Sequence, residues 1–360
     1  MERNSPTLNS VSQRTSQIQR IVLQYLNMIN KTKKRIAIVD ADMSIVEPIL
    51  EFIKDQYSIE LTDDPTADYV IHSVGGYDVL RYSGIRIFVA GENVSPNFMI
   101  SDYAMTFEKL NFGDRYVWLP LIKLYREAYS ALTCPRPPVD NVLSTKTDFC
   151  AYVMSNTSNS ASERTEIFDL LSDYKLVNSG GLWRNNVGGR VPDKRLFQLK
   201  HKFVIAFENC SHPGYLTEKF ADAAASNTVP IYWGDPEIAS VFNPKAFINC
   251  HDFQTLEEVV QRVKEIDQNE ILYRKMLSEP WFPNDIEPKC LQDETFSIFL
   301  SNIFDQEIEK AYRRNRGRWG KKKERQLYEM WTKPHIHGLK MLRTGWRSFY
   351  HSIIPRKKKY

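Results

Sequence analysis

The sequence predicts an α/β protein of two domains, each built as a parallel sheet with helices between its strands. Two blocks of short apolar runs alternate with helix-like segments, which is the pattern of an open α/β sheet. A proline-containing stretch at 126–146 separates the two blocks. The length of 360 residues suits two domains of about 100–200 residues better than a single core.

The first block covers residues 31–125 and follows a leader at 1–30 that is rich in Ser, Asn and Gln and ends in a short amphipathic helix. Short apolar runs predict strands in this block, and a helix is expected at 45–54. The expected strands are 35–39, 57–61, 69–72 and 85–89. This block is expected to form the N-terminal α/β domain.

The second block covers residues 147–300 and repeats the same alternation. Its expected strands are 149–154, 203–207 and 229–233, and its expected helices are 162–173, 216–225 and 256–266. The segment 126–146 is interpreted as the linker because it contains Pro135, Pro137 and Pro138. Two sheets joined by such a hinge predict a cleft between domains, where ligands commonly bind.

Hydropathy and cysteine usage favour a cytoplasmic protein. No apolar run reaches the ~18 residues needed to span a bilayer. The first ten residues lack the basic-then-apolar pattern of a signal peptide. The five cysteines include no pair closer than sixteen residues, which is typical neither of a disulfide framework nor of a zinc site. We expect reduced thiols in a protein without a transmembrane segment.

Charge is distributed unevenly along the chain. Residues 311–360 carry sixteen Lys/Arg and two acidic residues, a net charge of +14, while the remaining residues carry a net charge of −10. The same segment contains Trp319, Trp331 and Trp346. We interpret 301–360 as a basic aromatic tail that attaches to an anionic membrane surface, with a solvated tail as the alternative. Nucleic acid is not the expected partner, because the acidic body would repel it.

Asp40 and Asp42 directly follow the first expected strand. Two carboxylates at a strand end can hold a divalent metal, as in a metal-dependent phosphatase. The phosphatase pattern has Thr or Val two residues after the second Asp, whereas this chain has Ser44 at that position. The alternative interpretation is that both acids cap turns.

Glu92 stands in the run GENVSPNF, just after the expected strand 85–89. A carboxylate on a loop at a strand end can act as a general base if it projects into a cleft. The alternative is a solvated glutamate with no catalytic role.

The densest pattern runs from 203 to 235 and reads as strand, glycine-containing loop, helix and strand. Gly214 permits a tight approach of the backbone, and Thr217 is positioned to cap the following helix. The helix N-terminus and the mobile cation Lys219 together favour a diphosphate ligand. An ordinary strand–helix turn with a surface lysine is the alternative.

Three segments give this pattern a family resemblance. The run FVIAFENCSHPGYLTEKFADAAASNTVPIYWGDP closely resembles the donor-binding signature of the α-1,3-fucosyltransferases, glycosyltransferase family 10. The loop GENVSPNFMISDYAMTFEKLNFGDRYVWLPL resembles a second hallmark of that family, and NSGGLWRNNVGG at 178–189 resembles its Gly-rich Arg-Asn-Asn segment. The resemblance covers roughly residues 35–285, with the three motifs in family order.

The resemblance implies a GT-B fold, in which two Rossmann-like domains face each other across a cleft. It also implies GDP-fucose as co-substrate, inversion at the anomeric carbon, and no obligatory metal or other cofactor. Glu92 matches the family's catalytic base, and Arg164 matches an arginine that contacts the donor phosphates. The donor-binding residues that it implies are Arg164, Asn209, Tyr215, Glu218 and Lys219. Lys219 would reach the diphosphate, while Glu218 and Tyr215 would address sugar or ribose hydroxyls.

The expected reaction is transfer of L-fucose from GDP-fucose to the GlcNAc unit of an N-acetyllactosamine-type surface glycan, in α-1,3 linkage. Animal members of the family carry an N-terminal membrane span and paired cysteines, and this chain shows neither. We therefore expect a bacterial member that works in the cytoplasm, peripherally associated with the inner membrane through residues 311–360. The alternatives are a metal-dependent phosphatase using Asp40 and Asp42, and a membrane-binding protein without catalysis led by its tail.

Overall fold

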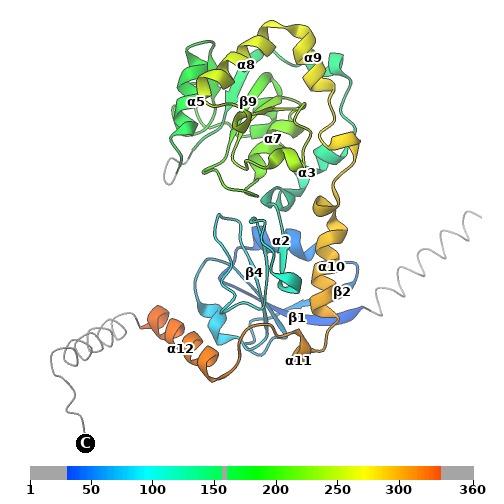
Figure 1. The fold of residues 1–360 in the computed structure, drawn as a ribbon, viewed down its shortest axis with the longest axis vertical. Coiled ribbons are helices and arrows are strands. Elements are labelled where there is room, and N and C mark those ends of the chain that lie inside the picture. Colours follow the sequence, from blue (N-terminus) through cyan, green and yellow to red (C-terminus); the bar gives the residue numbers. More distant parts are fainter. Residues whose placement is uncertain (1–30, 156–159, 334–360) are drawn as a thin grey trace, which may run out of the picture. The chain divides into compact units, whose positions relative to one another are not determined.

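The computed structural model describes residues 31–155 and 160–333, which fold as two compact units (Figure 1). The first unit contains the described residues up to Phe88, then Asn97–Tyr103, and all described residues from Leu300 onward. The second unit contains Val89–Pro96 and Ala104–Phe299. Each unit therefore draws on segments that are separated in the sequence.

The first sheet has six strands in the order β2-β1-β3-β4-β5-β6. Its strands are β1 (Thr32–Val39), β2 (Tyr57–Leu61), β3 (Tyr69–His72), β4 (Ile85–Val89), β5 (Tyr103–Thr106) and β6 (Tyr116–Trp118). Strand β1 pairs in parallel with β2 and with β3, and β3 pairs in parallel with β4. β3 and β4 are buried along their whole length, as expected for central strands covered on both faces.

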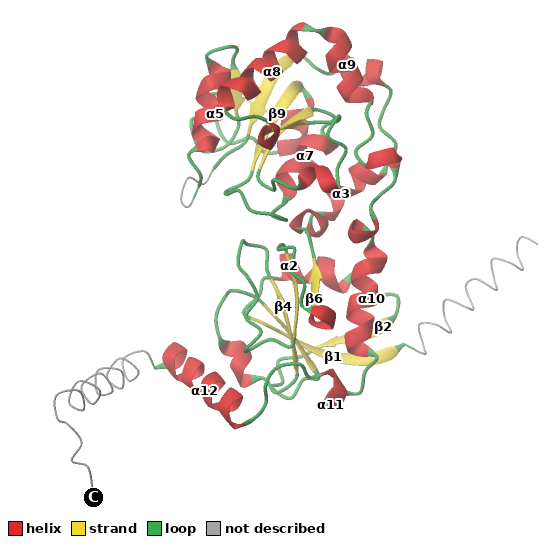
Figure 2. Ribbon diagram, in the orientation of Figure 1, coloured by secondary structure: helices red, strands yellow, loops and turns green. Residues whose placement is uncertain are grey.

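The second sheet has five parallel strands in the order β11-β10-β9-β7-β8 (Figure 2). They are β7 (Asp148–Tyr152), β8 (Val177–Ser179), β9 (His201–Phe207), β10 (Val229–Trp233) and β11 (Ile248–Asn249). Alternate residues of β9 enter different cores, because successive side chains of a strand point to opposite faces. Phe203 and Ile205 pack with residues of α5 and α8, while Val204 and Ala206 pack with α7. Helices thus cover both faces of this Rossmann-like sheet.

The α-helices connect these strands and extend beyond the second sheet. They are α2 (Met43–Leu50), α3 (Arg126–Thr133), α4 (Val139–Leu143), α5 (Glu163–Ser172), α6 (Lys194–Leu199), α7 (Glu218–Ala225), α8 (Leu256–Gln268), α9 (Glu270–Ser278), α10 (Asp293–Phe304), α11 (Ile308–Ala311) and α12 (Arg318–Thr332). Short 3₁₀ turns are η1 (Asp78–Arg81), η2 (Gly113–Arg115), η3 (Leu121–Leu124), η4 (Ile238–Ser240), η5 (Cys250–Asp252), η6 (Pro283–Asp285) and η7 (Lys289–Leu291).

Most expected elements agree with the structure. The strands expected at 57–61, 69–72, 85–89 and 229–233 match β2, β3, β4 and β10 residue for residue. The helix expected at 45–54 begins at Met43 and ends at Leu50. The sequence did not predict β5, β6 and β8, which have only three or four residues and too little pattern to detect.

The expected linker at 126–146 contains two helices, α3 and α4. Tyr129 and Leu132 of α3 are buried in the core that also holds Phe220 of α7. The three prolines lie between the end of α3 at Thr133 and the start of α4 at Val139. They therefore separate two helices, and the segment as a whole is not an extended linker. This segment belongs to the second unit.

The structure does not confirm a separate basic tail over residues 301–333, because these residues pack on the first unit. The ring of Phe304 lies 4.4 Å from that of Tyr69, and Leu327 of α12 packs against the core formed by Ala37, Val39 and their neighbours. Trp331 meets Tyr77 edge-on at 5.9 Å. Trp346 and the rest of 334–360 lie outside the described residues, as does the leader at 1–30.

Within the described parts of the chain, no helix is both long and apolar enough to cross a membrane. All five cysteines are free thiols, as expected. Cys150 and Cys250 are buried, whereas Cys134 is exposed.

Candidate active site

The loop between β9 and α7 carries most of the residues that the sequence singled out. β9 is the central strand of the second sheet and ends at Phe207. The carboxyl ends of parallel strands form the edge of an α/β sheet where ligands bind. The predicted site residues on this loop and in the first turn of α7 are Asn209, Tyr215, Glu218 and Lys219.

Gly214 lets this loop pass close to the segment that follows β5. Its φ of +83° is in the left-handed region, and a Cβ there would stand 2.2 Å from the carbonyl oxygen of Phe107. The next residue, Tyr215, is 2% exposed and meets the Phe107 ring edge-on at 5.5 Å. Burial raises the pKa of Tyr215 above its ordinary value. Tyr215 therefore lies in the packed interior of the loop.

Glu208 is a buried carboxylate that the sequence reasoning missed. Its side chain accepts hydrogen bonds from the Thr217 backbone N–H at 2.8 Å and from the Thr217 hydroxyl at 2.6 Å. Thr217 occupies the N-cap position of α7, but its hydroxyl bonds Glu208 and makes no cap to the helix, contrary to the expectation. Burial raises the pKa of Glu208, and the charge of Lys219 acts in the opposite direction.

Lys219 is held in place by two carboxylates. Its Nζ lies 3.0 Å from Glu208 Oε2 and 3.2 Å from Glu218 Oε1, and it also donates to the Thr217 hydroxyl at 3.0 Å. Burial acts to lower the pKa of Lys219, but the two carboxylates outweigh it and raise that pKa. The expectation of a mobile cation is therefore wrong, because the ammonium is fixed and stays charged at neutral pH.

Arg164 and Asn209 come together although 45 residues separate them. Arg164 lies in the first turn of α5. Its guanidinium donates to Asn209 Oδ1 at 3.0 Å and to the Ser160 hydroxyl at 2.8 Å. Arg164 is 4% exposed, and its Nε has no hydrogen-bond partner among the described residues. A buried guanidinium with an unused donor at this sheet edge is suited to a phosphate.

Glu92 lies on an exposed loop beside the same site. Its neighbour Asn93 donates from Nδ2 to Cys210 Sγ at 2.8 Å, which joins this loop to the one that follows β9. The negative charge of Glu92 contributes to the raised pKa of both Tyr215 and Tyr125. The structure therefore places Glu92 near the β9–α7 loop, with its own side chain exposed.

Tyr125 and Lys194 also border the site, and no sequence motif pointed to either residue. Tyr125 is 44% exposed at the start of α3, and burial together with the charge of Glu218 raises its pKa to about 12. Lys194 pairs with Asp222 at 2.6 Å and lowers the pKa of Glu218 together with Lys219. Tyr125, Lys194 and Asp222 line a polar cavity of about 500 Å³.

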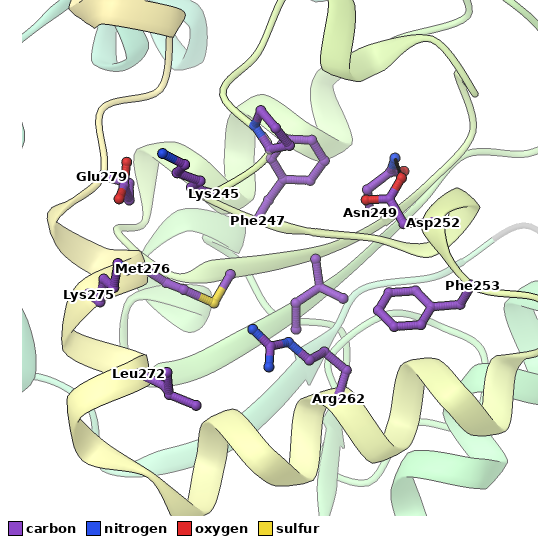
Figure 3. Close-up of a pocket in the computed structure, with 12 residues that line it drawn as sticks. Lys245, Phe247, Asn249, Asp252, Phe253, Arg262, Leu272, Lys275, Met276 and Glu279 are labelled. Carbon is purple, nitrogen blue, oxygen red and sulfur yellow. Dashed lines mark hydrogen bonds between the residues drawn. The ribbon is translucent and has the colours of Figure 1, made fainter.

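A second cavity, of about 340 Å³, lies between β11 and the helices α8 and α9 (Figure 3). Its floor is apolar, with Phe247 and Met276, and Lys245 and Arg262 stand at its sides. None of the predicted site residues lines it.

Asp40 and Asp42 behave as turn-capping acids. Asp42 is the N-cap of α2 and accepts the Ser44 N–H at 2.8 Å, which lowers the pKa of Asp42. Asp40 accepts the Val79 N–H at 3.0 Å. Among residues 31–155 and 160–333, no group of three or more His, Cys, Asp or Glu side chains is arranged to hold a metal ion.

Two parts of the chain match known protein families. Residues 36–125 match the family described as the alpha-(1,3)-fucosyltransferase FucT N-terminal domain. Residues 143–286 match the C-terminal domain of glycosyltransferase family 10 (fucosyltransferase). The chain belongs to glycosyltransferase family 10. The matched ranges contain Glu92 and all five residues of the predicted donor site.

Individual relatives agree with this family. The alpha-(1,3)-fucosyltransferase FucT of Helicobacter pylori is 36% identical over 267 residues, which are 64% of this chain and 55% of that protein. A putative fucosyltransferase of Acanthamoeba polyphaga mimivirus is 28% identical over 285 residues, 74% of this chain and 45% of the relative. The family 10 chain spans about half the length of these two curated relatives.

The fold also agrees with a solved family 10 structure. A crystal structure of an alpha1,3-fucosyltransferase with GDP-fucose superposes with a TM-score of 0.67 at 30% identity, over 77% of this chain and 92% of that one. The expected fold class, GT-B with two Rossmann-like α/β domains, is thereby confirmed.

Proposed function

We propose that this family 10 chain is an inverting fucosyltransferase that uses GDP-fucose. The observation that carries the proposal is the fixed cation Lys219, 3.0 Å from the buried Glu208, at the sheet edge that also holds Arg164. The buried Arg164 and the half-buried Lys219 suit a diphosphate that gathers negative charge as it departs. The GDP-fucose in the solved alpha1,3-fucosyltransferase supports the choice of donor.

In the proposed reaction Glu92 accepts the proton of an acceptor hydroxyl as that oxygen attacks the anomeric carbon of fucose. The bond from the anomeric carbon to the β-phosphate oxygen breaks, and GDP leaves with the electron pair. Attack opposite to the departing phosphate inverts the anomeric centre. Arg164 and Lys219 stabilise the charge on GDP, while Glu218 and Asn209 orient hydroxyl groups of the donor.

We propose the GlcNAc unit of an N-acetyllactosamine-type surface glycan as the acceptor, with α-1,3 linkage. The name of the Helicobacter pylori relative supports this linkage. The test is incubation of the purified chain with GDP-fucose and two disaccharides, Gal-β-1,4-GlcNAc and Gal-β-1,3-GlcNAc, followed by NMR of the product. Fucose on O3 of the β-1,4 disaccharide, with an anomeric configuration opposite to the donor, is expected. Hydrolysis without transfer to either sugar would refute the proposal.

We further propose that the protein works in the cytoplasm and attaches peripherally to the inner membrane. Support comes from residues 334–360, which contain seven Lys/Arg, no acidic residue and Trp346. Each basic residue near an anionic surface contributes about 1 kcal/mol. Co-sedimentation with anionic and neutral vesicles tests this proposal, comparing the full chain with a chain that ends at Lys333. Salt-sensitive binding only to anionic vesicles, lost on truncation, is expected, and equal pelleting of both chains would contradict it.

A further inference from the structure

The first unit contains a strongly cationic cavity of about 320 Å³ between the segment 80–86 and the start of α12. We call it the arginine pocket. Its charged lining residues are Arg81, Arg86, Arg314, Arg316, Lys321 and Glu324. Five cations thus face one carboxylate, and none of them belongs to the proposed active site.

Asp102 lies beside the pocket and offsets part of its positive charge. Oδ1 accepts the backbone N–H groups of Arg313 and Arg314, each at 2.8 Å. Oδ2 accepts the backbone N–H of Arg86 at 2.9 Å and is also paired with the Arg314 guanidinium. This buried carboxylate therefore balances one guanidinium and fixes the chain at 313–314.

Glu324 pairs with two buried guanidiniums, those of Arg86 and Arg314. It lies 3.3 Å from Arg86 Nη1 and 3.4 Å from Arg314 Nε. Arg86 is 2% exposed, and its Nε has no hydrogen-bond partner among the described residues. The remaining donors of Arg86 go to the carbonyl oxygens of Ile100 and Tyr82. One N–H donor of this pocket-lining guanidinium is thus unused.

The positive charges of Arg86 and Arg314 repel each other in this pocket. Burial and the neighbouring charge of Arg314 lower the pKa of Arg86 to about 10, although Glu324 and Asp102 act to raise it. An additional anion would relieve this repulsion. Burying an incompletely compensated cation costs free energy, so the pocket favours a ligand that supplies negative charge.

The mouth of the pocket adds cations that are free to meet a ligand. Arg81, Arg316 and Lys321 are exposed. The Arg316 guanidinium lies 3.6 Å from the centre of the Tyr312 ring, a stacking contact that holds it in place and leaves its N–H edges open. The pocket therefore has an exposed cationic rim in addition to two buried guanidiniums.

We propose that the arginine pocket binds a phosphate group, carried by a phosphomonoester or by a phospholipid headgroup. Guanidinium groups bind phosphate with paired N–H···O bonds, and the surplus of positive charge here exceeds what a single carboxylate would balance. The cavity has room for about ten water molecules, which is ample for a phosphate group with part of its ester. The inference does not depend on the proposed transferase activity, because its residues all lie in the first unit.

Two matched triple variants of the full chain test this inference. The pocket variant replaces the rim residues Arg81, Arg316 and Lys321 by Gln, which leaves the buried Asp102–Arg314 pair intact. The control variant replaces Arg318, Lys322 and Lys323 by Gln, which removes the same charge from α12 but from residues that do not line the pocket. Circular dichroism and the thermal midpoint of each variant check that it folds.

Calorimetric titrations use inorganic phosphate and a soluble short-chain phosphatidic acid, with GDP present throughout to occupy the proposed donor site. We expect the pocket variant to lose affinity for the phosphate group about tenfold or more, and the control variant to bind like the wild type. Competition between the two ligands, with tighter binding of the lipid, would identify a headgroup site. Binding of inorganic phosphate without competition from the lipid would identify a soluble phosphate ligand. Equal loss of affinity in both variants, or no binding by the wild type, would overturn the proposal.

Discussion

The β9–α7 loop of the second unit and the arginine pocket of the first unit both bury charge, but they balance it differently. In the loop, two carboxylates hold one ammonium, since Glu208 and Glu218 both lie within 3.2 Å of Lys219. In the pocket, two buried guanidiniums share Glu324. The loop fixes a cation for a ligand that arrives at the sheet edge, whereas the pocket has cationic charge left over.

The two regions also differ in how their residues are spread along the sequence. Glu208 and Lys219 are eleven residues apart, on the strand–loop–helix unit that connects them. Asp102 and Arg314 are 212 residues apart and meet only after the chain returns from α10 to the first unit. Local charge pairs are visible as motifs, while pairs formed by a returning chain are not.

The largest expected effect concerns the second unit. Glu92→Gln should lower kcat for fucosyl transfer by about 10²–10⁴-fold, because the amide cannot accept the acceptor proton. Affinity for GDP should change little. Steady-state kinetics with Glu265→Gln as a matched surface control measures this. A Glu92→Gln enzyme with nearly normal turnover would remove Glu92 from the reaction.

The first unit is expected to depend on the returning chain for its stability. A chain that ends at Lys310 removes Arg314 and two of the three backbone N–H donors to Asp102, and removing the charged partner of a buried carboxylate costs about 3–5 kcal/mol. Urea unfolding of chains that end at Lys310 and at Lys333 compares this directly. The longer chain keeps α12 and should be as stable as the full chain, and equal stability of the two truncations would contradict the packing of 311–333.

The sequence predicted features that are local in the chain better than contacts between distant segments. Runs such as 203–207 and 229–233 carry their own apolar pattern, and the donor motif lies within 33 residues of chain, so local reading located both. Charge counts over 311–360 led to the prediction of a separate basic tail that attaches to a membrane surface, because composition cannot show that Arg314 pairs with Asp102 or that Leu327 reaches a core. Glu208 was not predicted for a related reason. Its importance comes from its burial and its contacts with Thr217 and Lys219, and these are properties of the fold.

The buried His72 of the first unit should make the free energy of unfolding depend on pH in the acid range. The pKa of His72 is lowered from 6.5 to about 3 by burial and by the nearby charges of Arg86 and Arg314. The unfolded chain takes up a proton below pH 6.5 while the folded chain does not, so stability is lost as pH falls from about 6.5 toward 3. The slope is at most about 1.4 kcal/mol per pH unit for one proton. Urea unfolding of His72→Asn should show a flatter profile over this range, and an identical profile would contradict the assignment.

The smallest effect is expected from metal removal. Arg164 and Lys219 supply the positive charge at the proposed donor site, so EDTA should leave most of the transfer activity intact. Rates measured with EDTA and after addition of Mg²⁺ check this. Activity that is abolished by EDTA and restored by Mg²⁺ would return Asp40 and Asp42 as candidate ligands.

The central claim is that the Glu208–Lys219 pair forms a site for the donor diphosphate. Lys219→Met removes the cation but also leaves Glu208 buried without its partner, so loss of folding and loss of binding have to be separated. The double variant Glu208→Gln/Lys219→Met removes both charges and is expected to fold. Lys175→Met, which removes a surface lysine paired with Asp267 in the same unit, is the matched control.

The most direct measurement is calorimetric titration of GDP into the wild type, the double variant and the Lys175→Met control. Loss of one charge-assisted contact should weaken GDP binding by about 1.5–3 kcal/mol, or roughly 10- to 150-fold, in the double variant. The wild type and the Lys175→Met control should bind GDP equally. If the folded double variant binds GDP as tightly as the wild type, the β9–α7 loop is not the diphosphate site.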